Sequence, residues 1–309
     1  MTVNYRERLK IAQSKCEAKN IEVTRAEWLM LDLFQWQKTD YLLHADEIMT
    51  EAHNVLFDNA EARMLQGEPI QYIVGTQSFY GEIFKVNEHC LIPRPETEEV
   101  VLHFYNLVKS GDKVVDIGTG SGNIPILLKK MNQYLDVLAT DLYDAALSVA
   151  KDNAQYHDVD ITFLQGDALN PLIEKNIKVN GLISNPPYIA DSEKSLMEDT
   201  VLRYEPTSAL FAEDNGFQVY DKILEQLPDV LLPNAIVVFE IGYKQGLTLK
   251  KKIEEKYPAV CVQIIKDINN NDCNMTKSYV EVEKISNKEY LYKAHLVCDE
   301  NNYETKDGE

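Results

Sequence analysis

The sequence predicts an α/β protein with a mostly parallel central sheet, preceded by a small domain of helices. Strand-like and helical segments alternate between residues 100 and 283, which is the pattern of βαβ units whose helices cover both faces of one sheet. An apolar strand at 113–117 leads into a glycine-rich turn. Residues 5–66 instead carry apolar side chains at helical spacing. A chain of 309 residues is long enough for one large and one small domain.

The N-terminal 70 residues are expected to form a small helical domain. Helical periodicity runs through residues 5–66, and Gly67 then ends the pattern. Thr24 and Glu27 have the spacing of a capping box, in which both side chains satisfy free amides at the start of a helix. The aromatic and methionine residues of residues 1–70 are expected to build the core of this domain.

Residues 71–92 are expected to form a β-hairpin that links the two domains. Glycines at positions 75 and 81 supply its turns. The residues that suit strands are Tyr72, Ile73, Val74, Phe79, Tyr80, Ile83, Phe84 and Val86.

Seven strands are expected in the main domain, which we assign to residues 93–288. The strands are expected at 113–117, 136–140, 161–164, 181–184, 235–241, 260–265 and 279–282. The main helices are expected at 124–131, 145–155, 216–227 and 246–256. The polar, acidic segment 289–309 is expected to be a disordered tail.

Charge and composition count against several classes of protein. A formal net charge of −19 would repel nucleic acid and attract a basic protein partner. The chain has no apolar run of membrane-spanning length and no signal-peptide core, so we expect a cytoplasmic protein without a membrane partner. The five cysteines are scattered, which predicts neither a disulfide framework nor a metal site. We expect the protein to be a monomer.

The glycine-rich turn is the first candidate ligand site. Its residues, with the acid of the preceding strand, are Asp116, Gly118, Thr119, Gly120, Ser121 and Gly122. Glycines let the backbone approach a ligand closely, and the following helix directs free amides toward it. Dinucleotide phosphates and the carboxylate of S-adenosylmethionine both suit such a turn, so it does not decide between these cofactors. If Ser121 capped the helix, Pro125 would stand where the first intrahelical hydrogen bond forms, which predicts a later start or a bend.

Two acidic residues follow the next two strands. Asp141 lies at about the distance from the turn at which a carboxylate binds ribose hydroxyls. The alternative is that Asp141 caps the next helix, although Asp144 could do so instead. Asp167 follows the third strand, where its carboxylate or a nearby amide could reach an adenine amino group. An ordinary turn residue is the alternative for Asp167.

The segment Asn185-Pro186-Pro187-Tyr188 follows the fourth apolar strand and selects between the cofactors. A parallel sheet places it at the carboxyl edge, beside the glycine-rich turn. The side-chain oxygen of Asn185 and the carbonyl of Pro186 can each accept a hydrogen bond from a substrate NH₂ group, while Tyr188 offers a flat face. This pocket suits a glutamine amide, adenine or cytosine, and it does not suit a lysine ammonium group. A proline-rich turn is the alternative, but the pairing with the glycine-rich turn favours methyl transfer from S-adenosylmethionine, with residues 185–188 as the catalytic segment.

Longer segments resemble those of the release factor glutamine methyltransferases, the HemK/PrmC family. These segments are Arg63 to Gly75, Phe79-Tyr80-Gly81, Leu91 to Glu98, Glu205 to Leu210 and Asp214-x-Gly216. The run Ile-Pro-Arg-Pro-Glu-Thr-Glu at 92–98 is more specific than the glycine-rich turn, because DNA methyltransferases that share Asn-Pro-Pro-Tyr lack it. The resemblance covers most of the chain.

The resemblance implies a Rossmann-like, class I S-adenosylmethionine-dependent methyltransferase fold with a seven-stranded mixed sheet, and an N-terminal helical bundle that binds release factors. It implies methylation of the side-chain nitrogen N5 of the glutamine in the Gly-Gly-Gln tip of peptide chain release factors. The residues implied to contact S-adenosylmethionine are Asp116, Gly118, Thr119, Gly120, Ser121, Gly122, Asp141, Asp167 and Asn185. The residues implied to hold the glutamine are Phe79, Arg94, Thr97, Asn185, Pro186, Pro187 and Tyr188.

The chain departs from the family pattern at two places. Ala168 stands where the family often has an aromatic residue, so adenine stacking is expected to come from elsewhere. Residues 269–274 replace a Gly-x-x-Arg turn.

Three other functions compete with this interpretation: an adenine-N6 DNA or RNA methyltransferase, a non-catalytic scaffold and a Rossmann dehydrogenase. The negative charge and the run at 92–98 count against a nucleic-acid methyltransferase. The intact glycines and Asn185 count against a non-catalytic scaffold. Residues 185–188 count against a dehydrogenase, because they have no role in its chemistry.

Overall fold

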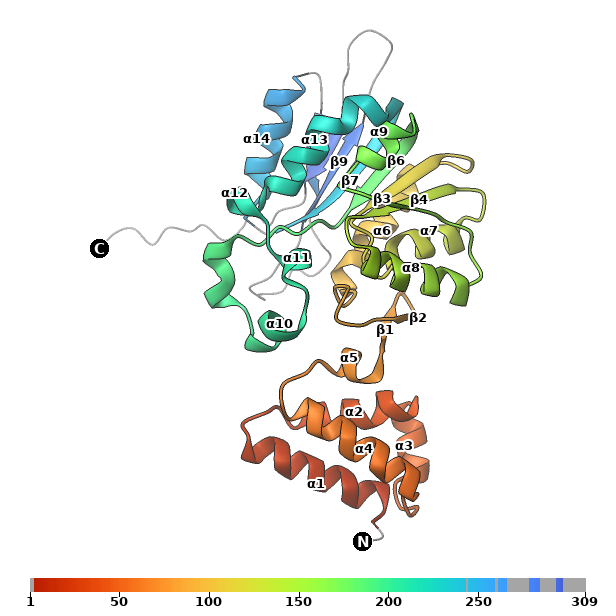
Figure 1. Ribbon diagram of the computed structural model, residues 1–309, viewed down its shortest axis with the longest axis vertical. Helices are drawn as coiled ribbons and strands as arrows, with labels where there is room; N and C mark the ends of the chain where they lie inside the picture. Colours follow the sequence, from red (N-terminus) through yellow and green to blue (C-terminus); the bar gives the residue numbers. More distant parts are fainter. Residues whose placement is uncertain (1–2, 243, 259–260, 266–277, 284–292, 297–309) are drawn as a thin grey trace, which may run out of the picture.

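The protein consists of a helical N-terminal domain and a larger α/β domain, joined by a short hairpin (Figure 1). The computed structural model describes residues 3–242, 244–258, 261–265, 278–283 and 293–296. The segment at 269–274 and residues 289–292 and 297–309 of the expected tail lie outside these ranges.

The N-terminal domain is built from four helices and the short helix that follows them. They are α1 (Tyr5–Ala18), α2 (Thr24–Phe34), α3 (Lys38–His44), α4 (Glu51–Met64) and α5 (Ile70–Val74). Leu29, Met30 and Phe57 are fully buried in the shared core, as the helical periodicity predicted. The predicted capping box of α2 is wrong. The N-cap residue is Val23, which makes no side-chain hydrogen bond to the helix, and the hydroxyl of Thr24 donates to the carboxylate of Glu22 at 2.7 Å.

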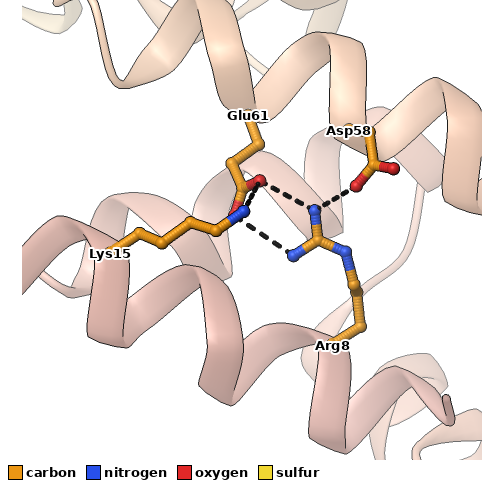
Figure 2. Close-up of polar contacts among 4 residues, drawn as sticks. All are labelled: Arg8, Lys15, Asp58 and Glu61. Carbon is orange, nitrogen blue, oxygen red and sulfur yellow. Dashed lines mark hydrogen bonds and ion pairs between the residues drawn. The ribbon is translucent and has the colours of Figure 1, made fainter. Parts of the chain in front are cut away.

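A buried ion pair joins α1 to α4 inside this domain (Figure 2). The guanidinium of Arg8 donates to both carboxylate oxygens of Glu61, at 3.1 and 2.8 Å, and to Asp58 at 2.6 Å. Lys15 also donates to Glu61, at 2.7 Å. Burial would raise the pKa of the Glu61 carboxyl, but hydrogen bonds and charges from Arg8 and Lys15 outweigh burial and hold this pKa below its ordinary value. Glu61 therefore stays ionised at neutral pH.

We expect Glu61→Gln to lower the free energy of unfolding by about 1.5–3 kcal/mol at neutral pH, because Arg8 would keep a buried charge without its buried partner. Asp58→Asn is the matched control, since it touches the same guanidinium but its side chain is 63% exposed; we expect a loss under about 1 kcal/mol. Denaturant unfolding measures both. The Glu61 effect should shrink as pH falls through the lowered pKa, where the wild-type carboxyl also becomes neutral. Equal losses in the two variants would contradict this account.

The linker differs from the expected hairpin in its first part. Tyr72, Ile73 and Val74 were expected in a strand but lie in helix α5, and the strands begin later, as β1 (Thr76–Phe79) and β2 (Glu82–Lys85). Ile70, Ile73 and Val74 recur at helical spacing and pack on the N-terminal core, so tertiary packing outweighs the strand propensity of these residues. Gly75, with φ of +81°, ends the helix in the left-handed conformation.

All seven predicted strands of the main domain are confirmed, and the described residues add an eighth. The strands are β3 (Lys113–Ile117), β4 (Asp136–Asp141), β5 (Thr162–Gln165), β6 (Val179–Ser184), β7 (Leu231–Ile241), β8 (Cys261–Ile265), β9 (Ser278–Glu283) and β10 (Lys293–Leu296). Their order is β10-β8-β9-β7-β6-β3-β4-β5, and β9 is antiparallel to its neighbours. The sheet is therefore mixed, as predicted. The extra strand β10 corrects the expectation that all of 289–309 is disordered, because its backbone pairs with β8.

Helices cover both faces of this sheet (Figure 1). One face packs against α6 (Pro95–Leu107), α7 (Asn123–Met131) and α8 (Asp144–Tyr156). The other packs against α9 (Asn170–Glu174), α13 (Gln218–Val230) and α14 (Gly246–Lys256). Short elements connect β6 to β7: η1 (Asp191–Leu196), α10 (Asp199–Tyr204), α11 (Thr207–Leu210) and α12 (Glu213–Gly216).

The start of α7 resolves the question that Pro125 raised. The N-cap residue is Gly122 rather than Ser121, so Pro125 is the third residue of the helix. The amide of that position has no intrahelical acceptor in any helix, and proline loses nothing there. The first intrahelical bond runs from the Ile126 amide to the Gly122 carbonyl at 3.1 Å, so the helix starts one residue later than a Ser121 cap would place it, which confirms the expected later start.

Candidate active site

The glycine-rich turn and residues 185–188 lie side by side at the carboxyl edge of the sheet. Strands β3 and β6 are parallel neighbours, and Ile117 is paired with Ser184 at their ends. The hydroxyl of Ser184 donates to the carbonyl of Ile117 at 2.7 Å, which ties the two strand ends together. Gly118 and Asn185 are the next residues of the two strands, so the predicted juxtaposition is confirmed.

The turn after β3 takes a conformation that suits glycine. Gly118, Gly120 and Gly122 have φ of +73°, +53° and +79°. A Cβ on Gly122 would lie 3.0 Å from the Cβ of Ala150 in α8, so this glycine lets the two helices approach. Nothing lies within 4 Å of a Cβ built on Gly118, so the space beside this residue is open. The turn thus packs closely against α8 at Gly122 and has open space beside Gly118.

Two buried polar side chains at this turn have no hydrogen-bond partner among the described residues. In Asp116, which is 1% exposed, neither carboxylate oxygen has a partner. In Thr119, which is 3% exposed, the hydroxyl has none. Burial raises the pKa of Asp116 to about 7, although the nearby hydroxyl of Thr119 opposes this shift. Buried polar groups are normally satisfied, so an unpaired carboxyl beneath a glycine turn fits a ligand that brings a donor or a positive charge. The ammonium group of S-adenosylmethionine has this chemistry.

Asp141 is bound to the backbone at the same edge. Its carboxylate accepts hydrogen bonds from the amides of Gly120 and Tyr143, both at 2.9 Å. Burial raises the pKa of Asp141, and these backbone hydrogen bonds oppose the shift. The alternative that Asp141 or Asp144 caps α8 is wrong, because the N-cap residue is Tyr143, with no side-chain hydrogen bond. Asp141 is therefore fixed next to the turn, as a ribose-binding acid would be.

Asp167 lies farther along this edge, after β5. Its carboxylate accepts a hydrogen bond from Lys222 at 2.6 Å, and both side chains are 41% exposed. Ala168 beside it is buried in the left-handed conformation, with φ of +52°, and its carbonyl accepts from the hydroxyl of Thr140 at 3.1 Å. An adenine contact by Asp167 stays a prediction.

Hydrogen bonds from neighbouring elements fix segment 185–188 at its first and last residues. Asn185 donates through Nδ2 to the hydroxyl of Thr97 at 3.2 Å, which leaves its oxygen Oδ1 on the other side. The carbonyl of Tyr188 accepts from the side chain of Gln245 at 2.8 Å. Gln245 in turn accepts from the amide of Gly242 at 3.0 Å. The turn after β7 thus fixes the end of segment 185–188.

The three residues expected around the glutamine have different positions. Thr97 is 2% exposed and lies behind Asn185 rather than on the pocket wall. Arg94 forms an ion pair with the buried carboxylate of Glu205 at 2.6 Å. Phe79 is fully buried and packs edge-to-face against Phe84, with ring centroids 6.0 Å apart. The structure therefore brings Thr97 to Asn185 but places the Phe79 ring in the core.

Sequence reasoning missed Glu240 and Gln245. Glu240 is fully buried near the end of β7, where its Oε2 accepts from the hydroxyl of Thr97 at 2.6 Å. An acid inside the apolar run Val237-Val238-Phe239-Glu240-Ile241 is a signal that could have found it, because a buried charge needs a partner. Gln245 had no comparable signal.

Neither a metal site nor a membrane span is found in the part of the chain that the structure describes. No group of three or more acidic, histidine or cysteine residues there could hold a metal ion. No described helix is both long and apolar enough to cross a membrane.

Two family descriptions match this chain. Residues 7–75 match the PrmC N-terminal domain, and residues 99–227 match the methyltransferase small domain. The chain is 53% identical over 270 residues to the release factor glutamine methyltransferase of Staphylococcus aureus (strain NCTC 8325 / PS 47), which covers 87% of this chain and 97% of that protein. It is 40% identical over 275 residues to the same-named protein of Enterococcus faecalis (strain ATCC 700802 / V583), covering 88% and 98%.

Solved structures share the fold. The hMettl16 catalytic domain, in complex with MAT2A 3'UTR hairpin 1, superposes with a TM-score of 0.51 over 82% of this chain and 90% of that chain. Its sequence is 16% identical, so this likeness concerns the methyltransferase fold alone.

Proposed function

The chain belongs to the family of release factor glutamine methyltransferases, and we propose that it transfers a methyl group from S-adenosylmethionine to the side-chain nitrogen N5 of the glutamine in the Gly-Gly-Gln motif of peptide chain release factors. Its family and fold imply the use of S-adenosylmethionine. One observation supports an amide substrate: the NH₂ group of Asn185 donates to the hydroxyl of Thr97, so the side-chain oxygen of Asn185 faces the site.

The cofactor fits the residues around the glycine turn. The carboxyl of Asp116 and the hydroxyl of Thr119 would hold the methionine end, and Gly118 to Gly122 would let the backbone lie against it. Asp141 would bind the ribose hydroxyls, and Asp167 would contact the adenine. When bound, the cofactor supplies an electrophilic methyl group on its sulfonium.

The protein's own contribution to the reaction is to position a poor nucleophile. An amide nitrogen is weakly nucleophilic because its lone pair is delocalised into the carbonyl. The oxygen of Asn185 and the carbonyl of Pro186 would accept the two N–H groups, and Tyr188 would lie against the amide plane. Such alignment can lower a barrier by about 7–11 kcal/mol. The same two oxygens favour the positive charge that develops on the nitrogen during transfer.

No general base is required by this chemistry. Once the nitrogen is methylated it is strongly acidic, and water can take its proton. The enzyme therefore needs two well-placed acceptors more than it needs a titrating side chain.

The helical N-terminal domain is proposed to bind the release factor. The net charge of −19 would favour a basic surface on that partner and disfavour nucleic acid. We propose that the enzyme acts as a monomer in the cytoplasm. Adenine-N6 methylation of DNA or RNA, the main alternative, is not supported by the relatives, which are named for a protein glutamine.

Labelled S-adenosylmethionine tests this assignment. We expect label to enter a purified release factor and to be absent from a copy in which the glutamine of the Gly-Gly-Gln motif is replaced by alanine. Equal labelling of both copies would contradict the glutamine assignment. Label in DNA or RNA, with none in the release factor, would favour the adenine alternative.

A further inference from the structure

We propose that Glu240 is a positioning residue for methyl transfer. Acting through the hydroxyl of Thr97, it fixes which end of the Asn185 side-chain amide faces the substrate. This inference rests on the proposed function, in which the oxygen of Asn185 accepts a hydrogen bond from the substrate amide.

The three side chains form one hydrogen-bonded series across three elements. Asn185 follows β6, Thr97 lies in the first turn of α6, and Glu240 lies in β7. The Nδ2 of Asn185 donates to Thr97 Oγ1 at 3.2 Å, and Thr97 Oγ1 donates to Glu240 Oε2 at 2.6 Å. Asn185 is half-buried, whereas Thr97 and Glu240 are 2% and 0% exposed. The series therefore leads from the site into the protein interior.

The contacts of Thr97 fix the direction of these hydrogen bonds. A threonine hydroxyl has one proton, and Thr97 Oγ1 donates to Glu240 Oε2. Thr97 gives this proton to Glu240, so it can offer Asn185 only a lone pair. The group of Asn185 that faces Thr97 must then be NH₂, and Oδ1 must face the site.

Shape alone would not make this choice. The oxygen and the NH₂ group of an amide are nearly the same size, so either orientation would fit the same space. An inverted Asn185 would present donors to the NH₂ group of the substrate, and two donors cannot form a hydrogen bond. The substrate nitrogen would then lose one of the two acceptors that align it.

The strand that carries Glu240 is held independently of its carboxylate. The residue pairs through its backbone with Tyr279 of β9, and its carbonyl accepts from the hydroxyl of Tyr220 at 2.7 Å. A change confined to the side chain is therefore expected to leave β7 in place. This makes the carboxylate separable from the fold by experiment.

Glu240→Gln tests the proposal, since it keeps the size of the side chain but adds a donor that permits the inverted order. We expect kcat for the release factor to fall about 10- to 100-fold, as for loss of a supporting contact, while the Kd of S-adenosylmethionine by calorimetry stays within about twofold. Thr97→Val removes the hydroxyl at equal volume and should lose a similar factor. Thr97→Ser keeps the hydroxyl and should retain kcat within about threefold. The double variant Glu240→Gln/Thr97→Val should be no slower than the slower single variant.

Three results would overturn the proposal. One is a Glu240→Gln enzyme with the wild-type kcat. A second is a double variant whose losses multiply, since the two residues would then act separately. The third is a loss in Thr97→Val that Thr97→Ser does not rescue, which would indicate a packing role. Wild-type enzyme in the same assay separates the two proposals: no transfer from wild type would count against the proposed function instead.

Discussion

Asn185→Ala is expected to lose methyl transfer by on the order of a hundredfold to a thousandfold, which is the usual cost of removing one preorganised polar group at the reacting atom. The variant removes the oxygen that we propose accepts a substrate N–H, and it leaves the hydroxyl of Thr97 without the NH₂ group it now accepts from at 3.2 Å. The fold should persist, because Asn185 is half-buried and lies beyond the last residue of β6.

Single-turnover transfer with labelled S-adenosylmethionine and excess enzyme measures this loss directly. Asn132→Ala is a suitable control, because Asn132 follows α7 at the opposite edge of the sheet and is also half-buried. We expect the control to transfer at the wild-type rate and both variants to unfold cooperatively. Transfer at the wild-type rate by Asn185→Ala would refute the role of residues 185–188.

The parts of the site that depend on one strand and its turn were predictable from the sequence. A parallel strand that ends in glycines, and another that ends in Asn185, must reach the same sheet edge once both are buried. The pairing of Ile117 with Ser184 confirms this expectation. The periodicity of the strands and the main helices is a local property as well, and it placed them within a few residues.

Contacts between distant segments could not be predicted in the same way. Thr97 meets Asn185 and Glu240 across 88 and 143 residues of sequence, and no local pattern encodes such a partner. Arg94 and Glu205 lie in two segments that resemble the family, but only the fold brings them to 2.6 Å. Each of these three contacts joins two different elements of the fold, so packing decides which polar groups meet.

Helix α5 illustrates the same limit for secondary structure. Its β-branched and aromatic residues favour a strand in isolation, and the neighbouring N-terminal core reverses this preference. Ile70, Ile73 and Val74 bury one helical face there. A strand would direct alternate residues away from that core. The helix is therefore favoured, because it buries all three of these apolar side chains against the core.

Gly216→Ala is expected to slow methyl transfer strongly, although Gly216 lies in α12 and not in segment 185–188. Gly216 has φ of +87°, and the two residues before it, Asp214 and Asn215, are also left-handed, with φ of +53° and +56°. A Cβ at Gly216 would lie 2.0 Å from the carbonyl oxygen of Tyr188 and 2.5 Å from the side-chain nitrogen of Gln245. These are the two atoms of the 2.8 Å hydrogen bond that fixes the end of segment 185–188. The methyl group must separate them.

The expected result is a fall in transfer of about a hundredfold, since a displacement near 1 Å at a reacting group costs roughly this much. Gly111→Ala is the matched control, because Gly111 has φ of +90° and nothing within 4 Å of the added Cβ. Both variants carry the left-handed strain of about 1–2 kcal/mol, which thermal unfolding measures, but only Gly216→Ala pushes on Tyr188. Loss of transfer in Gly216→Ala with wild-type transfer in Gly111→Ala would therefore assign the effect to the position of residues 185–188. Equal activity in the two variants would contradict a role for the contact between residue 216 and Tyr188.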